Sequence, residues 1–302
     1  YFLYTILGAA AAGGLMMLVT RPKNKTIYAR DGLMTVALSW IVLSLVGAVP
    51  FTLSREIPSY LDAVFEMISG FTTTGSSILP DVEALSHCML FWRSFSHWIG
   101  GMGILVFMLI VLPLAGGQTI YLMRAESPGP SVSKISPHMR DTALILYAIY
   151  FGLTVLQIIL LLFGGMPMFD AICVSLGTAG TGGFGNWNNS IAHYDSAYLQ
   201  NVISVFMILF GINFNAYFLL LTRKFKQLFK IEEIRVYLGV IAVFTTLIAF
   251  NVRGCFGSLR ESFHHSLFQV ASIITTTGFS TVDFNQWPAF SKLLLVLLMF
   301  IG

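Results

Sequence analysis

Charged side chains are scarce in this chain of 302 residues. Asp, Glu, Lys and Arg make up 10% of it, whereas hydrophobic residues make up 56%. Soluble domains carry about 25% charged residues, so a soluble fold of this length would lack the polar surface that it needs. The 14% of aromatic residues suits the interfaces of a bilayer, where Trp and Tyr are enriched. The composition therefore indicates a membrane protein.

Cysteine is also scarce, which excludes two further classes of site. Cys88, Cys173 and Cys255 are far apart and form no CxxC motif, so neither a zinc site nor a disulfide framework is supported. We interpret them as small residues in or near apolar helices. The formal net charge is only +3, and no basic cluster alternates with aromatic residues as in a nucleic-acid groove. Nucleic acid is therefore not expected as a partner.

Three similar Thr/Gly segments organise the chain. They lie at 72–77 (TTTGSS), 181–185 (TGGFG) and 275–280 (TTTGFS). Each follows a short apolar segment of about ten residues, which as a helix would span roughly 15 Å, half of a bilayer. Their key glycines, Gly75, Gly183 and Gly278, are 108 and 95 residues apart. This spacing predicts a repeated unit in which a half-length helix leads into a loop.

The hydrophobic runs predict three repeats of the order span, half-helix, loop, span. Full spans are expected at 32–53, 91–114, 141–163, 198–222 and 236–251, half-helices at 58–71, 167–177 and 262–274, and a last apolar run from Trp287. The expected divisions are 1–31 (a preceding transmembrane helix and cytoplasmic loop), 32–117 (first pore repeat), 118–140 (cytoplasmic linker), 141–222 (second pore repeat), 223–235 (cytoplasmic basic loop) and 236–302 (third pore repeat, truncated in its last helix). The predicted fold class is an all-α membrane protein.

The placement of Lys and Arg predicts the orientation in the membrane. One side would carry twelve of them: Arg21, Lys23, Lys25, Arg30, Arg124, Lys134, Arg140, Arg223, Lys224, Lys226, Lys230 and Arg235. The other side would carry five: Arg55, Arg93, Arg253, Arg260 and Lys292. The richer side is expected to be cytoplasmic, so that the half-helices and their loops enter from outside. Nine of the fourteen acidic residues fall on the outer side, where they would concentrate cations.

Backbone carbonyl groups of the three loops are the expected ion ligands. A dehydrated monovalent cation needs several oxygens with partial negative charge, and carbonyls supply them without a counter-ion that would trap the ion. Glycine permits the dihedral angles that aim carbonyls at one axis. Each half-helix would also direct its negative C-terminal end to mid-membrane, which favours a cation. The candidate filter residues are Thr73, Thr74, Gly75, Thr181, Gly182, Gly183, Thr276, Thr277 and Gly278.

Two aspartates recur at one register of the repeat. Asp62 and Asp170 each lie thirteen residues before the key glycine, and His265 stands at that offset in the third repeat. A short polar residue there can cap the N-terminus of a half-helix. We therefore interpret the aspartates as helix caps rather than ion ligands.

Other polar or small residues have structural interpretations as well. Arg93 is expected to snorkel or to pair with an acid, and His97 and Trp98 are expected to anchor the chain at the membrane interface. The glycines of 100–103 are expected to start a spanning helix and to pack against the first loop.

Two further pairs complete the set of candidates. The adjacent side chains of His264 and His265 would diverge on a helix and form a poor metal site. Asn213 and Asn215 are expected inside a spanning helix, where they would hydrogen-bond between helices or line the pore.

Longer motifs carry a resemblance to a known family. They stand at 30–32 (RDG), 69–75 (SGFTTTG), 98–103 (WIGGMG), 121–130 (YLMRAESPGP), 169–172 (FDAI) and 275–279 (TTTGF). With these motifs the chain resembles the Trk/Ktr/HKT superfamily of potassium transporters, most closely its bacterial TrkH/TrkG branch. The resemblance implies covalently linked repeats around a pseudo-four-fold ion pore, of which three are present. It also implies one filter glycine per repeat, which Gly75, Gly183 and Gly278 match.

The resemblance extends to ion, partners and location. Glycine rather than serine at Gly75 implies potassium, with K+ ions in the filter and no organic cofactor. The family implies a multi-pass protein of the bacterial inner membrane in contact with the lipid bilayer, a homodimer, and a TrkA-like cytosolic regulatory subunit that binds nucleotide and gates the pore. The cytosolic loops 118–140 and 223–235 are the candidate docking sites for that subunit.

The chain departs from the family pattern in two places. The second loop reads Thr181-Gly182-Gly183 instead of Thr-Thr-Gly, and a gating loop and fourth repeat are expected beyond Gly302, so we expect the chain to be a segment of a longer protein. Two alternatives to channel-like potassium uptake stay open. One is a symporter coupled to Na+ or H+, in which inverted repeats are expected; the remote one is an intramembrane enzyme that uses His or Asp.

Overall fold

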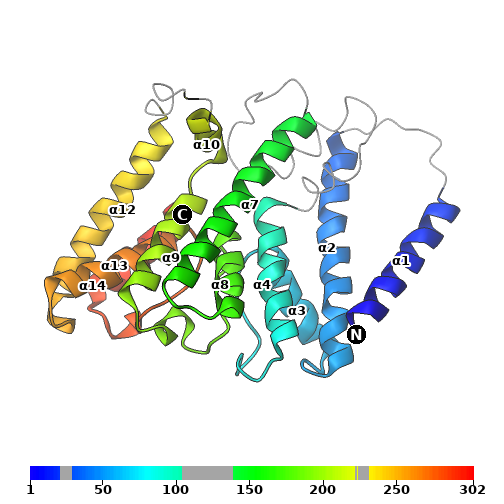
Figure 1. Ribbon diagram of the computed structural model, residues 1–302, viewed down its shortest axis with the longest axis horizontal. Helices are drawn as coiled ribbons and strands as arrows, with labels where there is room; N and C mark the ends of the chain where they lie inside the picture. The colour runs from blue at the N-terminus through cyan, green and yellow to red at the C-terminus, as the bar shows by residue number, and fades with distance from the viewer. Residues whose placement is uncertain (21–28, 104–138, 222, 224–230) are drawn as a thin grey trace.

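The computed structural model describes residues 1–20, 29–103, 139–221, 223 and 231–302 (Figure 1). In these ranges every regular element is a helix and no β-strand occurs. Residues 104–138 lie outside the described residues, and with them the end of the predicted second span and nearly all of the linker 118–140. The same holds for eight of the basic residues used to predict orientation: Arg21, Lys23, Lys25, Arg124, Lys134, Lys224, Lys226 and Lys230.

Four helices in the described part of the chain are long and apolar enough to cross a membrane. They are α1 (Phe2–Val19), the segment Met34–Ser54 of α2 (Ala29–Ser54), the segment Leu144–Phe163 of α7 (Met139–Phe163), and α12 (Glu232–Asn251). No more than 28% of any of these segments is buried inside the structure. Their remaining apolar side chains are therefore left for lipid. The prediction of an all-α membrane protein is confirmed.

The helices form three successive units of the same order. Each unit has a long helix, a half-helix and a return helix: α2, α3 (Tyr60–Phe71) and α4 (His87–Met102); α7, α8 (Met168–Ala179) and α9 (Ala197–Phe210); α12, α13 (Leu259–Ile274) and α14 (Ala289–Ile301). Helices α3 and α8 have 12 residues each, which corresponds to roughly 18 Å, too short to span. Three short 3-10 helices lie in the connections between these helices: Ser190–His193 (η1) between α8 and α9, Arg253–Cys255 (η2) between α12 and α13, and Phe284–Gln286 (η3) between α13 and α14.

Neighbouring units pack through their return helices. Helix α4 of the first unit contacts α8 of the second, and α9 of the second contacts α13 of the third. A buried apolar cluster joins the second and third units, since Phe268 and Phe279 pack among residues such as Leu161 and Met207. The three units therefore form one body rather than three separate hairpins.

The two ends of the helix array hold different connections (Figure 1). The end drawn at the top holds the N-terminal ends of α2, α7 and α12, and helix α10 (Phe214–Leu221). The opposite end holds the connection from each long helix into its half-helix. All three half-helices thus start from one end and stop inside the array, where Gly302 also lies.

The caps of the half-helices correct one prediction. Ser59 and Ser258 cap α3 and α13, and their side chains accept hydrogen bonds from the backbone N–H groups of Asp62 and Glu261, while Pro167 precedes α8 without a side-chain cap bond. The interpretation of Asp62 as a cap is wrong, because α3 begins two residues before it. The third half-helix likewise begins at Leu259, three residues before the predicted start.

Asp170 is not a cap either. It lies inside the first turn of α8 and is buried. Its carboxylate accepts hydrogen bonds from Asn186 Nδ2 at 2.8 Å and from Trp187 Nε1 at 3.3 Å. The side chain therefore fastens the segment after the second loop onto the start of the half-helix.

The predicted span 198–222 is broken. Helix α9 ends at Phe210 and α10 begins at Phe214. A Cβ atom added at Gly211 would lie 2.5 Å from Tyr237 Oη and 2.9 Å from Thr275 Cγ2, so the chain passes these side chains closely. Asn213 consequently lies in the break and not inside a helix, and its Nδ2 donates to Glu233 Oε2 at 3.4 Å. The side chain of Asn215 lies outside the described residues.

Gly100 and Gly101 lie in the last turn of helix α4, which begins at His87, so the expectation that they start a helix is wrong. Gly103, with φ 78°, is the C-cap residue. The expected contact with the first loop is confirmed, because a Cβ at Gly100 would lie 2.3 Å from the carbonyl oxygen of Phe71 and 2.8 Å from Thr73 Cγ2. Such distances leave no room for any side chain.

We expect Gly100→Ala to destabilise the protein by about 1–3 kcal/mol, since the added methyl group meets backbone atoms that cannot rotate away. Thermal unfolding in detergent would measure the change. Gly152→Ala is the matched control in α7, because no atom in the described part of the chain lies within 4 Å of its Cβ position. That substitution is expected to be neutral or stabilising by up to about 1 kcal/mol through helix propensity. Equal effects of the two substitutions would contradict the close contact.

Candidate ion-binding loops

Each half-helix ends in the same turn. The N–H group of Thr73 donates to Gly70 O at 3.1 Å, and that of Thr74 donates to Ser69 O at 2.9 Å. The same two bonds recur at 181–182 and at 276–277. Together with a left-handed residue after the C-cap they make a Schellman motif. The three loops therefore leave their helices in one common geometry.

Threonine occupies the left-handed position in all three turns. Thr73, Thr181 and Thr276 have φ angles of 54°, 51° and 57°. Glycine is the usual residue at this position, and a β-branched residue with positive φ is an outlier. Such a conformation costs about 1–3 kcal/mol and persists only where the surrounding structure enforces it. Its recurrence at three equivalent positions marks these turns as candidates for function.

The key glycine follows two residues later and is also left-handed. Gly75, Gly183 and Gly278 have φ angles of 77°, 78° and 88°. The residue between each Thr and Gly is not in this region. The loop backbone therefore alternates in handedness, unlike a β-strand.

The three loops lie side by side. A Cβ added at Gly75 would lie 2.0 Å from the carbonyl oxygen of Gly182, and one at Gly183 would lie 1.9 Å from that of Thr277. Each of these glycines thus faces the carbonyl that precedes the key glycine of the next loop. Around Gly278, no atom of the residues that the structure describes lies within 4 Å of the Cβ position. The first loop therefore contacts the second and the second contacts the third, whereas the far side of the third loop, at Gly278, is open.

His97 explains why the second loop lacks a threonine at position 182. In the first and third loops, pairs of threonine hydroxyls contact each other behind the turn, at 72 and 74 and at 275 and 277. The second loop has Gly180 and Gly182 at these positions. A Cβ at Gly182 would lie 2.3 Å from the ring of His97, and one at Gly180 would lie 2.2 Å from its carbonyl oxygen. The imidazole occupies the space that a threonine would need.

The expectation that His97 anchors the chain at the interface is wrong. The side chain is fully buried. Its Nδ1 lies 2.8 Å from Gly70 O, and because a carbonyl only accepts, Nδ1 carries the proton. The ring also packs 4.1 Å from that of Phe184. Trp98 is half-buried and donates from Nε1 to Thr154 Oγ1 at 3.2 Å, a contact between helices.

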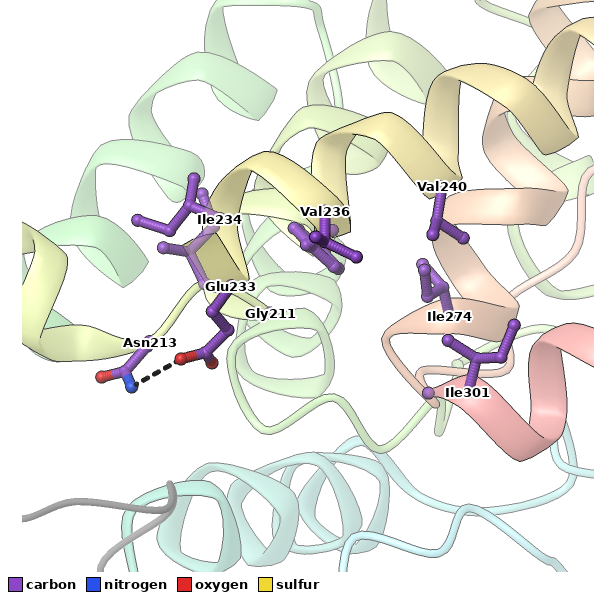
Figure 2. Close-up of a pocket in the computed structure, with 11 residues that line it drawn as sticks. Gly211, Asn213, Glu233, Ile234, Val236, Val240, Ile274 and Ile301 are labelled. Atoms are coloured by element: carbon purple, nitrogen blue, oxygen red, sulfur yellow. Dashed lines mark hydrogen bonds between the residues drawn. The ribbon is translucent and has the colours of Figure 1, made fainter. Parts of the chain in front are cut away.

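A cavity of about 290 Å³ lies where two of the half-helices end. Its lining includes Ala179 and Ile274, the last residues of α8 and α13, together with Thr181 and Thr276. The negative ends of these two helix dipoles therefore face the cavity. An adjoining pocket of about 340 Å³ is mostly apolar, and Figure 2 shows the Asn213–Glu233 hydrogen bond at its edge.

The two histidines of α13 have separate partners. His264 contacts Gln200 Oε1 at 2.7 Å and Asn201 Oδ1 at 3.0 Å, whereas His265 contacts Thr281 Oγ1 at 3.0 Å. Among the residues that the structure describes, no group of three His, Cys, Asp or Glu side chains could hold a metal ion. The two histidines therefore hydrogen-bond separately to neutral side chains.

Comparison with known sequences identifies the family. The family described as "TrkH: Cation transport protein" matches residues 2–302. The chain belongs to this family. It is 37% identical over 308 residues to the Trk system potassium uptake protein TrkH of Salmonella typhimurium, and 33% identical over 308 residues to the Trk system potassium uptake protein TrkG of Escherichia coli (strain K12). Both alignments cover 100% of this chain and 63% of the relative.

A solved structure supports the same assignment. The crystal structure of the potassium transporter TrkH from Vibrio parahaemolyticus matches with a TM-score of 0.83 at 29% sequence identity. The match covers 98% of this chain and 62% of that chain. The chain thus spans less than two thirds of these members of the TrkH family. The relatives are named as transporters, which accords with the prediction that the chain is not an enzyme.

The three loops were predicted from the sequence, but the residues that fix their conformation were not. The left-handed threonines were not expected, since glycine alone was assigned special dihedral angles. Glu66 is one of the nine acidic residues expected on the outer side, and no other role was predicted for it, yet it forms a buried ion pair with Arg93 at 2.7 Å. The pairing of Arg93 with an acid is confirmed. An acid inside an apolar half-helix was the available signal, because ionisable residues within a membrane nearly always have partners.

We expect Gly182→Ala to destabilise the protein by about 1–3 kcal/mol, because its methyl group overlaps the ring of His97. Combining it with His97→Ala removes the overlap, so the two substitutions should be non-additive by about 0.5–3 kcal/mol in the favourable direction. Thermal unfolding of the single and double variants in detergent measures this coupling. Gly239→Ala in α12, whose Cβ position meets no atom of the described residues within 4 Å, should instead combine additively with His97→Ala. Additivity in both cycles would refute the role of His97 as a wedge.

Proposed function

We propose that this chain belongs to a protein that takes up potassium through a filter of backbone carbonyls. The filter residues are those predicted from the sequence, namely Thr73, Thr74, Gly75, Thr181, Gly182, Gly183, Thr276, Thr277 and Gly278. One observation carries the proposal: three loops leave their half-helices by the same left-handed turn and lie side by side at their key glycines.

The geometry suits an alkali cation. Backbone alternation in handedness is compatible with successive carbonyls on one side of each loop, where they replace the hydration shell of the ion. Helix dipoles of α8 and α13 favour positive charge in the cavity next to the loops. Carbonyls carry no full charge, so an ion can leave again. The inside-negative potential supplies about 2.3 kcal/mol per charge per 100 mV, and no covalent step is needed.

The names of the relatives support the choice of potassium as the ion. The three relatives named above carry names for potassium uptake or potassium transport, and glycine stands at all three key positions of this chain. We infer that the end of the array that holds the N-termini of α2, α7 and α12 faces the cytoplasm, and that the half-helices enter from outside a bacterial plasma membrane. A homodimer and a TrkA-like cytosolic subunit that binds nucleotide and gates the pore complete the proposed assembly.

The open side of the loop row has a place in this proposal. Among the residues that the structure describes, Gly278 has no neighbouring loop of the kind that Gly75 and Gly183 have, and the chain covers only 63% of the length of its TrkH relative. A fourth loop on that side would close the ring of carbonyls. We therefore assign potassium conduction to the complete protein and the three loops to its filter.

Substitution of the key glycines tests the proposal. In the complete protein, Gly75→Ser, Gly183→Ser and Gly278→Ser should each lower the preference for K+ over Na+ by about tenfold, since a side chain at positive φ turns the carbonyls away from their common axis. Competitive 86Rb+ uptake in cells that lack other potassium uptake systems measures the preference. Gly239→Ser in α12 is the control and should leave it unchanged. An unaltered preference in all three filter variants would rule out these loops as the filter.

A further inference from the structure

A buried ion pair stands directly behind the first loop. Glu66 of α3 and Arg93 of α4 are 0% and 2% exposed, and Arg93 Nε lies 2.7 Å from Glu66 Oε1. An ion pair in such a place loses most of its hydration, and an apolar pair of similar volume would often be equally stable or more so. Stability alone therefore does not account for two full charges beside the loop.

The carboxylate of Glu66 binds the part of the first loop that follows Gly75. It accepts hydrogen bonds from Ser77 Oγ at 3.0 and 3.2 Å and from the backbone N–H of Ile78 at 3.0 Å. Ser77 and Ile78 follow Gly75 by two and three residues. Helix α3 therefore holds the loop at two points: the Schellman turn fixes the residues before Gly75, and the hydrogen bonds to Glu66 fix the residues after it.

The guanidinium of Arg93 contacts both the first and the second loop. Its Nη2 donates to Ser77 Oγ at 3.3 Å and its Nη1 to the carbonyl oxygen of Gly185 at 3.4 Å. Its Cζ lies 4.1 Å from the centre of the Phe184 ring. Gly185 and Phe184 directly follow the key glycine of the second loop. The planar fork of arginine can serve the carboxylate and a carbonyl together, which the point charge of lysine cannot.

The other two repeats lack this arrangement. Nine residues before the key glycine, where the first repeat has Glu66, stand Val174 and Gln269. Arg93 lies eighteen residues after Gly75, and that offset holds Asn201 and Val296 in the other repeats. The charged pair therefore belongs to the first repeat, and it contacts the first and second loops.

We propose that Glu66 and Arg93 are positioning residues that fix the separation of the first two loops and thereby set the preference of the filter for K+ over Na+. The ion does not touch either side chain. The two charges compensate each other, so that the loops are held rigidly without a net charge that would bind the ion. This inference rests on the proposed function and assigns the source of its selectivity.

Four variants of the complete protein test the inference. The apolar double variant Glu66→Leu/Arg93→Met keeps volume and leaves no unpaired buried charge, so it should fold. Arg93→Lys keeps the charge pair but removes the fork. Glu66→Gln leaves Arg93 unpaired and shows the cost of breaking the pair. Glu261→Gln, an exposed acid in the first turn of α13, is the matched control for loss of one negative charge.

The readouts separate positioning from stability. Thermal unfolding in detergent reports folding, and 86Rb+ uptake in competition with K+ and Na+ reports selectivity. We expect the apolar double variant to fold and to lose K+ over Na+ preference by about tenfold, below the 10²-fold that a misplacement of ~1 Å can cost in a preorganised site. Arg93→Lys should lose less, and Glu261→Gln nothing.

Each outcome decides. A folded double variant with wild-type selectivity overturns the inference, while Gly278→Ser, assayed in parallel, shows whether the filter itself stands. If neither Gly278→Ser nor the double variant alters selectivity, the proposed function fails together with the inference. If the double variant does not fold, Arg93→Lys carries the test: loss of preference at unchanged melting temperature supports positioning, and an unchanged preference refutes it.

Discussion

The structure depends on one backbone constraint, the left-handed turn that ends each half-helix. A helix normally stops this way with glycine, and here threonine does so three times. The turn puts the loop at the negative end of the half-helix and in contact with the loop of the next repeat. The surrounding structure has to enforce the turn. Gly100 lets α4 approach Phe71 and Thr73, and His97 fills the space behind the second loop. Glycine and histidine on one helix thus support two loops.

Much of this fold could be predicted from the sequence. Hydrophobic runs located the long helices, and the spacing of three Thr/Gly segments revealed the repeat, because periodicity and length are local properties. The half-helices were placed correctly, but their starts and caps were not: Ser59 caps α3, where Asp62 was expected to do so. A cap depends on where the first turn closes, which a shared register cannot reveal.

The support of the loops could not be predicted in the same way. The missing threonine at Gly182 looked like a departure from the family pattern, whereas it follows from His97, 85 residues earlier in the chain. The partner of Arg93 could be any outer acid until α3 and α4 were packed together. The break at Gly211 lies against Tyr237 of the next repeat. All three are contacts between distant segments, and a repeat pattern contains no information about them.

The central claim is that backbone oxygens of adjacent loops take the place of the water around a potassium ion. The most direct test is anomalous diffraction from crystals of the complete protein soaked in Rb+. The account predicts Rb+ peaks on a common axis, within coordination distance of the carbonyl oxygens of the loops that contain Gly75, Gly183 and Gly278. Peaks elsewhere in the protein, or loops whose carbonyls face lipid, would contradict it.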